Sequence, residues 1–171
     1  MPLPTVLSLD CEFKPLRCAI VDGAGRVCLD CLVTQRVAGS SERPLSGILR
    51  CDAPRLQKIE VNELRALLLR LVEGGTILVA HTPQSDLRAL SLLLSDGSMP
   101  PELLGRVIDV AQLGKPTPDA PTMSLKRMAA EHLNIQIQHG TTGGGSAGSR
   151  RHCAIEDARV TMQLYQQLSG Q

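Results

Sequence analysis

The amino-acid sequence predicts an α/β domain in which three antiparallel strands continue into parallel strands connected by helices. Three observations support this prediction. The start of the chain holds apolar runs around a short Asp-Gly turn at Asp22. Short apolar runs then alternate with segments whose leucines recur at helical spacing. No internal repeat or composition shift marks a boundary, so we expect residues 1–171 to form a single domain.

The first strands are predicted from the apolar runs at the start of the chain. Thr5 to Cys11 is expected to be a buried strand, and Arg17 to Val21 and Arg26 to Val33 a hairpin around the turn. Residues 34–58 are polar, aperiodic and rich in arginine. Two interpretations of this stretch remain open, a solvated connection and a basic flap near a phosphate backbone.

Helices and strands alternate after this connection. Val61 begins a segment with apolar residues at helical spacing, which Gly74 should end. Thr76 to Ala80 should form a central strand, and Thr82 should cap a helix that has Pro83 as its first residue. The apolar stripe expected to bury this helix comprises Leu87, Leu90 and Leu94.

The last third of the chain is expected to contribute one strand and two helices. Arg106 to Val110 has the apolar run of a strand, and residues 124–133 and 154–168 have helical patterns. A flexible segment rich in glycine and serine, residues 140–149, separates the two helices, and its role is not indicated by the sequence.

Composition restricts the classes of function. The net charge of +1 provides no general attraction for polyanions, and one Phe, one Tyr and no Trp leave few platforms for base stacking. Cys28 and Cys31 lie in a strand-like run that places them on opposite faces, so zinc is not expected. Without a secretory signal or a membrane-spanning run, we expect an intracellular protein with reduced cysteines, in the cytoplasm or the nucleus, with no membrane contact.

Carboxylates in three separate segments form the candidate site. Asp10 and Glu12 lie two apart in a strand, so both leave the same face, where a divalent cation such as Mg²⁺ or Mn²⁺ would relieve their repulsion. Asp86 lies in the first turn of a helix after a central strand, where α/β sites gather. Asp157 lies on the apolar stripe of the last helix. Solvation of the strand acids and a favourable helix dipole at Asp86 are the simpler interpretations.

A histidine near the last acid could complete the chemistry. His152 lies five residues before Asp157, about 140° away on a helix, so it should sit in the preceding loop above the site. Our hypothesis is that two metals roughly 4 Å apart bind a scissile phosphate, with Asp10 bridging them, while His152 takes a proton from the attacking water. His81 is the rival base, although its position suits a substrate contact or a structural hydrogen bond better.

In order along nearly the whole chain, these residues resemble the DEDDh 3′-5′ exonucleases. The resemblance is strongest to the RNA-exonuclease branch that includes the interferon-stimulated and yeast Rex-type enzymes. The most specific part is the string Glu156-Asp157-Ala158-Arg159 with Thr161-Met162 and Leu164-Tyr165. The other matching segments are Asp10-Cys11-Glu12-Phe13, Val79-Ala80-His81, Asp86-Leu87-Arg88-Ala89-Leu90, Ile108-Asp109, Ser124-Leu125-Lys126 and His152.

The resemblance implies an RNase H-like fold with a five-stranded mixed sheet flanked by helices. It implies release of nucleoside 5′-monophosphates from the 3′ end of single-stranded RNA or DNA, with RNA the more expected substrate. Cys11 and Phe13 match positions that contact the terminal nucleotide, and His81 is a further candidate contact. The resemblance implies two Mg²⁺ or Mn²⁺ ions with His152 as the general base, and as metal ligands Asp10, Glu12, Asp86 and Asp157.

Two other functions remain as alternatives. An exonuclease fold can hold RNA or a protein partner without cutting, although loss of an acid or the base would be expected in that case, and all five are present. A phosphodiesterase acting on very short oligonucleotides would need little grip on a phosphate backbone, which suits the near-neutral charge. Protein partners are not indicated by the sequence.

Overall fold

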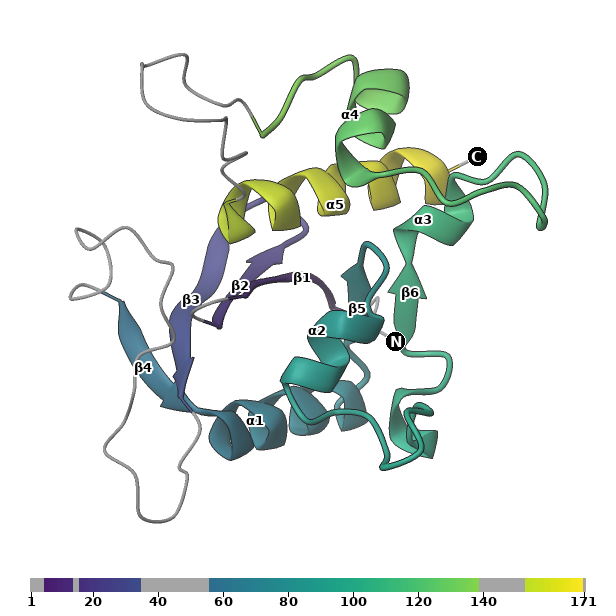
Figure 1. The fold of residues 1–171 in the computed structure, drawn as a ribbon. Helices are drawn as coiled ribbons and strands as arrows, with labels where there is room; N and C mark the ends of the chain where they lie inside the picture. The colour runs from purple at the N-terminus through teal and green to yellow at the C-terminus, as the bar shows by residue number, and fades with distance from the viewer. Residues whose placement is uncertain (1–4, 14–15, 35–55, 139–152, 171) are drawn as a thin grey trace, which may run out of the picture.

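The computed structural model describes residues 5–13, 16–34, 56–138 and 153–170. Its centre is a six-stranded mixed sheet with the strand order β4-β3-β2-β1-β5-β6 (Figure 1). Antiparallel pairing joins β2 to both β1 and β3, and the other neighbours are parallel. The strands are β1 Val6–Glu12, β2 Arg17–Asp22, β3 Val27–Thr34, β4 Gln57–Glu60, β5 Ile77–Ala80 and β6 Val107–Asp109.

The α/β class and the mixed sheet are confirmed, but the strand number differs from the expected five. Five of the strands, β3-β2-β1-β5-β6, correspond to the predicted ones. The sixth, β4, begins within residues 34–58, which were predicted to be a connection, and pairs with β3 at the edge of the sheet. Gln57 and Lys58 are exposed. Because β4 is short and mostly polar, its pairing relies on backbone hydrogen bonds. The sequence has no alternation of apolar residues there that would predict a strand.

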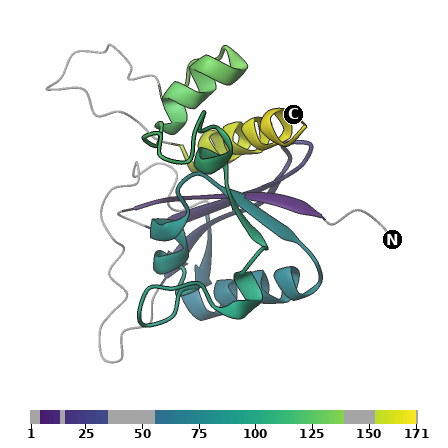
Figure 2. The same ribbon diagram turned by 90° about the vertical axis from the view of Figure 1, so that its right-hand side faces the viewer.

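The helices cover both faces of the sheet. Figure 2 shows α1 and α2 on one side of the sheet and α5 on the other, with α4 lying outside α5. None of the helices in the described ranges is long and apolar enough to cross a bilayer. The helices are α1 Val61–Glu73, α2 Gln84–Ala89, the 3₁₀ helix η2 Pro101–Leu103, α3 Val110–Leu113, α4 Leu125–Leu133 and α5 Ala154–Ser169.

Alternation along β1 divides its side chains between two cores. Leu7, Leu9 and Cys11 pack with the buried residues of α1 and α2. Val6, on the opposite face, packs against the clusters that contain the buried residues of α4 and α5. Since successive strand residues point to opposite faces, Ser8, Asp10 and Glu12 share the face of Val6 and lie toward α5.

The predicted start of α2 is wrong. The N-cap position is Pro83, which makes no side-chain cap bond, and Thr82 lies before the helix in the left-handed region at φ 52°. The helix is also shorter than its leucine pattern suggested, because Ser91 turns the chain at φ 54°. Leu94 therefore lies beyond the helix and is 48% exposed, whereas Leu87 and Leu90 are buried as expected.

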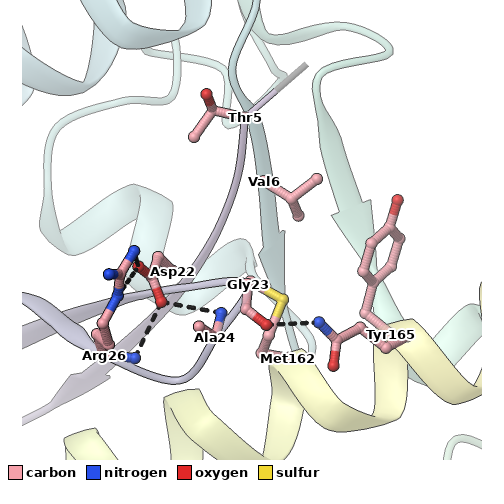
Figure 3. A pocket seen from close by; sticks show the side chains of 9 residues that line it. Thr5, Val6, Asp22, Gly23, Ala24, Arg26, Met162 and Tyr165 are labelled. Carbon is pink, nitrogen blue, oxygen red and sulfur yellow. Dashed lines mark hydrogen bonds and ion pairs between the residues drawn. The ribbon is translucent and has the colours of Figure 1, made fainter. Parts of the chain in front are cut away.

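The β2–β3 turn is attached to α5. Asp22 accepts hydrogen bonds from the backbone of Ala24 and Arg26, as the Asp-Gly turn predicted (Figure 3). Arg159 Nε donates to the carbonyl of Gly25 at 2.9 Å, and Gln166 donates to the neighbouring carbonyl of Gly23 at 2.6 Å. The last helix is thereby fixed to the hairpin at two points along its length.

The described cysteines have free thiols. Cys18 and Cys31 are buried in the core, Cys28 is exposed, and Cys153 is half-buried. Cys28 and Cys31 therefore lie on opposite faces of β3, as their spacing predicts.

Candidate active site

Three predicted metal ligands come together between β1 and the first turn of α5. Asp10 and Glu12 extend from the face of β1 that α5 covers, and Asp157 faces them from the buried stripe of the helix, where it is 3% exposed. One oxygen from each carboxylate lies within 4.8 Å of the others. This spacing would allow the three side chains to share one cation.

The electrostatics of this group favour a positive partner. Burial and the charges of Asp157, Asp86 and Glu12 raise the pKa of Asp10 from 3.8 to about 9. Carboxylate oxygens are the ligands that Mg²⁺ and Mn²⁺ prefer, and a cation would relieve the repulsion that holds the proton on Asp10. The donor set therefore fits a divalent metal ion.

Asp86 lies beside this group, in the first turn of α2 at the end of β5. The parallel pairing of β1 with β5 covers Val6 to Ser8, and β1 then continues past the end of its neighbour. Burial raises the pKa of Asp86 to about 7, with a further contribution from Glu12, and outweighs the backbone N–H of Cys11, which donates to the carboxylate and lowers its pKa. Asp86 thus belongs to the same electrostatic site without joining the closest group.

The turn that carries Asp86 is held by a residue from the next strand. Asp109, at the end of β6, accepts the backbone N–H of Thr82 at 2.8 Å and that of Ala111 at 3.0 Å. It therefore caps α3 and also stabilises the left-handed conformation of Thr82. Sequence reasoning assigned no role to Asp109, because the Thr82 contact spans 27 residues.

His81 forms a structural hydrogen bond. Its Nε2 donates to the carbonyl of Met123 at 2.9 Å, which ties the end of β5 to the segment before α4. The interpretations offered for His81 were a rival general base, a substrate contact and a bond of this kind, and the structure supplies the bond. A contact with substrate remains a prediction. His152, the predicted general base, lies outside the described residues.

The two residues after the strand acids point in different directions. The Cys11 side chain is 6% exposed in the core on the other face of β1, and its bond to Cys18 and its burial hold the pKa of its thiol well above the usual value. Any substrate contact at this position would therefore involve the backbone. Phe13 directly follows the acids and is 50% exposed, so its ring is available to a ligand.

Gln138 is a neighbour of the site that sequence reasoning did not find. It is 8% exposed, and its side-chain Nε2 donates to both oxygens of Asp157, at 3.1 and 3.4 Å. Its backbone is in the left-handed region at φ 56°. The only local signal is that a polar residue follows the alternating apolar pair Ile135 and Ile137, which is too weak to predict a contact with Asp157.

The acid group does not coincide with the pocket in Figure 3. That pocket has a volume of about 480 Å³ and lies between the β2–β3 turn and the later part of α5. Val6 and Tyr165 are among its lining residues. Because β1 runs from Val6 to Glu12, the strand acids lie about 13 Å (Asp10) and about 20 Å (Glu12) along the strand from Val6. The carboxylates lie instead where β1 ends.

A mixed sheet of this order, with carboxylates facing one another from β1 and the last helix, has an RNase H-like architecture. Solved structures support this class. The nuclease-containing catalytic unit of Neurospora crassa Pan2 matches with a TM-score of 0.67 and 22% identity over 99% of this chain and 28% of that one. The corresponding Saccharomyces cerevisiae Pan2 module, solved with AAGGA RNA, gives 0.69 and 20% over 98% and 29%. These likenesses confirm the fold.

Comparison of sequences gives more specific relatives. The chain is 33% identical to RNA exonuclease 4 of Saccharomyces cerevisiae over 93% of its own length and 53% of the relative. It is 30% identical to interferon-stimulated 20 kDa exonuclease-like 2 of Mus musculus, over 94% and 43%. It is 29% identical to exonuclease GOR of Pan troglodytes, over 94% and 22%. No family model matches the chain.

The chain is thus a relative of the RNA exonucleases, and the resemblance carried by its motifs is confirmed. It spans between about a fifth and a half of the length of these three relatives.

Proposed function

We propose that this protein is a metal-dependent 3′-5′ exonuclease that removes nucleoside 5′-monophosphates from single-stranded RNA, and from DNA less readily. The observation that supports this most strongly is the group formed by Asp10, Glu12 and Asp157, in which one oxygen of each carboxylate lies within 4.8 Å of the others. A partly buried cluster of negative charges of this kind is unfavourable unless it binds a cation. Its position in a chain related to RNA exonucleases supports a phosphodiester as the target.

The four acids would hold two Mg²⁺ or Mn²⁺ ions, with Asp86 completing the set from the end of β5. When bound, these ions would supply charge stabilisation at phosphorus and activation of water. His152 is proposed to accept the proton of the attacking water, because an imidazole has a pKa near neutrality. The acids themselves then remain ionised and hold position throughout the reaction.

Substrate binding is proposed to concentrate on the terminal nucleotide. Phe13 is half exposed directly after Glu12, where its ring can stack on a base beside the acids. Cys11 would contribute through its backbone. His81, already bonded to the carbonyl of Met123, would line the β5 side of the site. The Pan2 module solved with RNA supports RNA as the polymer, since it shares the fold.

A short-oligonucleotide phosphodiesterase is the second candidate, because a chain with a net charge of +1 offers little general attraction for a long polyanion. A non-cleaving module is less well supported, since all four acids and His152 are present. With RNA as substrate, the protein would work in the cytoplasm or the nucleus, and residues 1–171 would act as one domain.

The test is a gel time course on 5′-labelled single-stranded RNA and matched DNA with Mg²⁺, Mn²⁺ or EDTA. We expect a ladder that shortens from the 3′ end, requires metal and is faster on RNA. Asp10→Ala should abolish it, whereas Asp119→Ala, which removes an exposed acid between α3 and α4, should leave it unchanged.

Internal cleavage, or shortening that persists in EDTA or in Asp10→Ala, would contradict the proposal. If neither polymer is shortened, dinucleotides and trinucleotides are the next substrates, and cleavage of these alone would establish the second candidate.

A further inference from the structure

We propose that Gln138 is a positioning residue that holds the Asp157 carboxylate in the orientation needed to bind metal, and so sets the affinity of the site for its cation. This inference rests on the proposed function only in assigning Asp157 as a metal ligand. Gln138 belongs to no motif that identifies the site, and it lies in the segment between α4 and α5.

The contact is directed at the carboxylate itself. The amide Nε2 lies 3.1 Å from one oxygen of Asp157 and 3.4 Å from the other, in a buried setting. A carboxylate on the first turn of a helix can rotate about two side-chain bonds, and a donor shared between its oxygens restricts that rotation. The oxygens thereby stay turned toward Asp10 and Glu12, with which they form the closest group.

Gln138 is itself held in place from both sides. Ile137, the residue before it, is 2% exposed in the cluster that packs α4 against α5. The backbone N–H of Gln138 donates to the carboxylate of Glu156 at 3.4 Å. The adjacent acids Glu156 and Asp157 therefore accept hydrogen bonds from the backbone N–H and from the side-chain amide of Gln138, respectively. The two bonds together fix the position of the side-chain amide.

The backbone conformation indicates that this placement matters. Gln138 has a φ of 56°, in the left-handed region where residues other than glycine are uncommon. Asn or Gly would occupy this conformation at a lower cost. The shorter side chain of Asn would leave its side-chain amide about one carbon–carbon bond further from Asp157, and Gly has no side-chain amide.

The type of side chain at position 138 also suits a residue that orients a metal ligand. Lys or Arg would neutralise Asp157 and compete with a cation, and Glu would add a further negative charge to the group. The neutral amide donates a hydrogen bond and leaves the carboxylate its negative charge. Partners that orient metal ligands in this way typically change metal affinity or activity by 10- to 100-fold when they are removed.

The test measures metal binding without any substrate. The metal-free protein is titrated with Mn²⁺, and free Mn²⁺ is followed by electron paramagnetic resonance. Gln138→Met, which keeps the length but loses the donor, and Gln138→Asn, which suits the backbone but falls short, should each weaken Mn²⁺ binding by about 10-fold or more. The variants are first compared with wild type by thermal unfolding, and Gln138→Asn serves if Gln138→Met does not fold.

The matched control is Gln166→Met. It also removes a hydrogen bond donated by a glutamine side chain, but this bond runs from α5 to the carbonyl of Gly23 in the β2–β3 turn, away from the acids. It should leave Mn²⁺ affinity unchanged. Folded Gln138 variants that bind Mn²⁺ within twofold of wild type would overturn the inference, as would an equal loss in Gln166→Met. Weakened Mn²⁺ binding in a protein that cleaves no RNA would preserve this inference and reject the exonuclease proposal.

Discussion

At Asp10, burial and the neighbouring carboxylates act on a single side chain in the same direction. Its pKa rises to about 9 in the folded protein, whereas an unfolded Asp titrates near 3.9. Between these two values the metal-free folded state holds a proton that the unfolded state has lost. The contribution of Asp10 to stability is therefore fully present below about pH 4 and decreases as the pH rises toward 9.

Asp10→Asn should consequently stabilise the metal-free protein at neutral and alkaline pH, by roughly 1–3 kcal/mol. The amide has the shape of the protonated acid and no charge to lose, so the dependence of stability on pH should flatten. Thermal unfolding in EDTA at pH 5 and pH 8 measures this. Adding saturating Mn²⁺ should reverse the order, because the wild type gains binding energy that the variant lacks. A variant less stable than wild type in EDTA at pH 8 would contradict the electrostatic account.

His152→Ala should reduce kcat by about 10²- to 10⁴-fold, the usual contribution of a general base, and leave Mn²⁺ affinity within twofold. Single-turnover kinetics on labelled RNA and a Mn²⁺ titration give the two quantities. The control is His132→Ala, which removes a half-buried histidine of α4 that is assigned no role in the site. A normal rate in His152→Ala would move the role of base to His81.

At the scale of single elements, the β5–α2 turn determines where Asp86 lies. Thr82 is β-branched and adopts φ 52°, a conformation that costs of order 1–3 kcal/mol unless its surroundings stabilise it. Asp109 provides that stabilisation by accepting the Thr82 N–H at 2.8 Å. The end of β6 thus controls the entry of the chain into the helix that carries a predicted ligand.

Asp109→Ala should lower the free energy of unfolding by about 1–2 kcal/mol, because the cap of α3 and the acceptor for Thr82 are lost together. It should also reduce kcat/KM at least about 10-fold, because Asp86 is displaced. Asp96→Ala is the control, since it removes a carboxylate that accepts two hydrogen bonds from Ser98 in the turn after α2. Chemical denaturation and initial rates measure both effects. Equal rates in the two variants would show that the turn does not position Asp86.

Elements with strong periodicity could be predicted from the sequence, and elements determined by distant contacts could not. The hairpin at Asp22 and the buried stripe of α1 follow from local pattern, and both are observed. The edge strand β4 has no such pattern, because it depends on backbone pairing with β3. The capping role predicted for Thr82 failed because its backbone is left-handed at φ 52°, a conformation held by the bond from its N–H to Asp109, 27 residues away.

The candidate site divides in the same way. Strand parity placed Asp10 and Glu12 on one face, and the helical stripe placed Asp157 inward, so the three could be expected to meet. Gln138 could not be anticipated, because its role depends on a left-handed backbone and on a partner 19 residues away. Local patterns thus identify candidate ligands, whereas a contact such as that of Gln138 with Asp157 becomes apparent only in three dimensions.

For the whole molecule, the low net charge predicts a weak dependence on salt and on substrate length. We expect kcat/KM for RNAs of about 6 and about 20 nucleotides to differ by less than about threefold, because binding concentrates at the 3′ end. The slope of log kcat/KM against log salt should be shallower than about −2, equivalent to fewer than three phosphate contacts on a single strand. A slope steeper than about −4 would instead assign backbone binding to the arginine-rich stretch 34–58, and Arg43→Ala with Arg50→Ala should then flatten it.

The attachment of α5 to the β2–β3 turn also bears on the order in which the protein acquires its activity. The hydrogen bonds from Arg159 and Gln166 span 134 and 143 residues, so they join the first hairpin to the last helix. During synthesis, at about 5–20 residues per second, Asp10 and Glu12 leave the ribosome several seconds before Asp157. A nascent chain therefore carries an incomplete set of acids while it is still close to its own messenger RNA, and the set is completed only once α5 has been made and has docked.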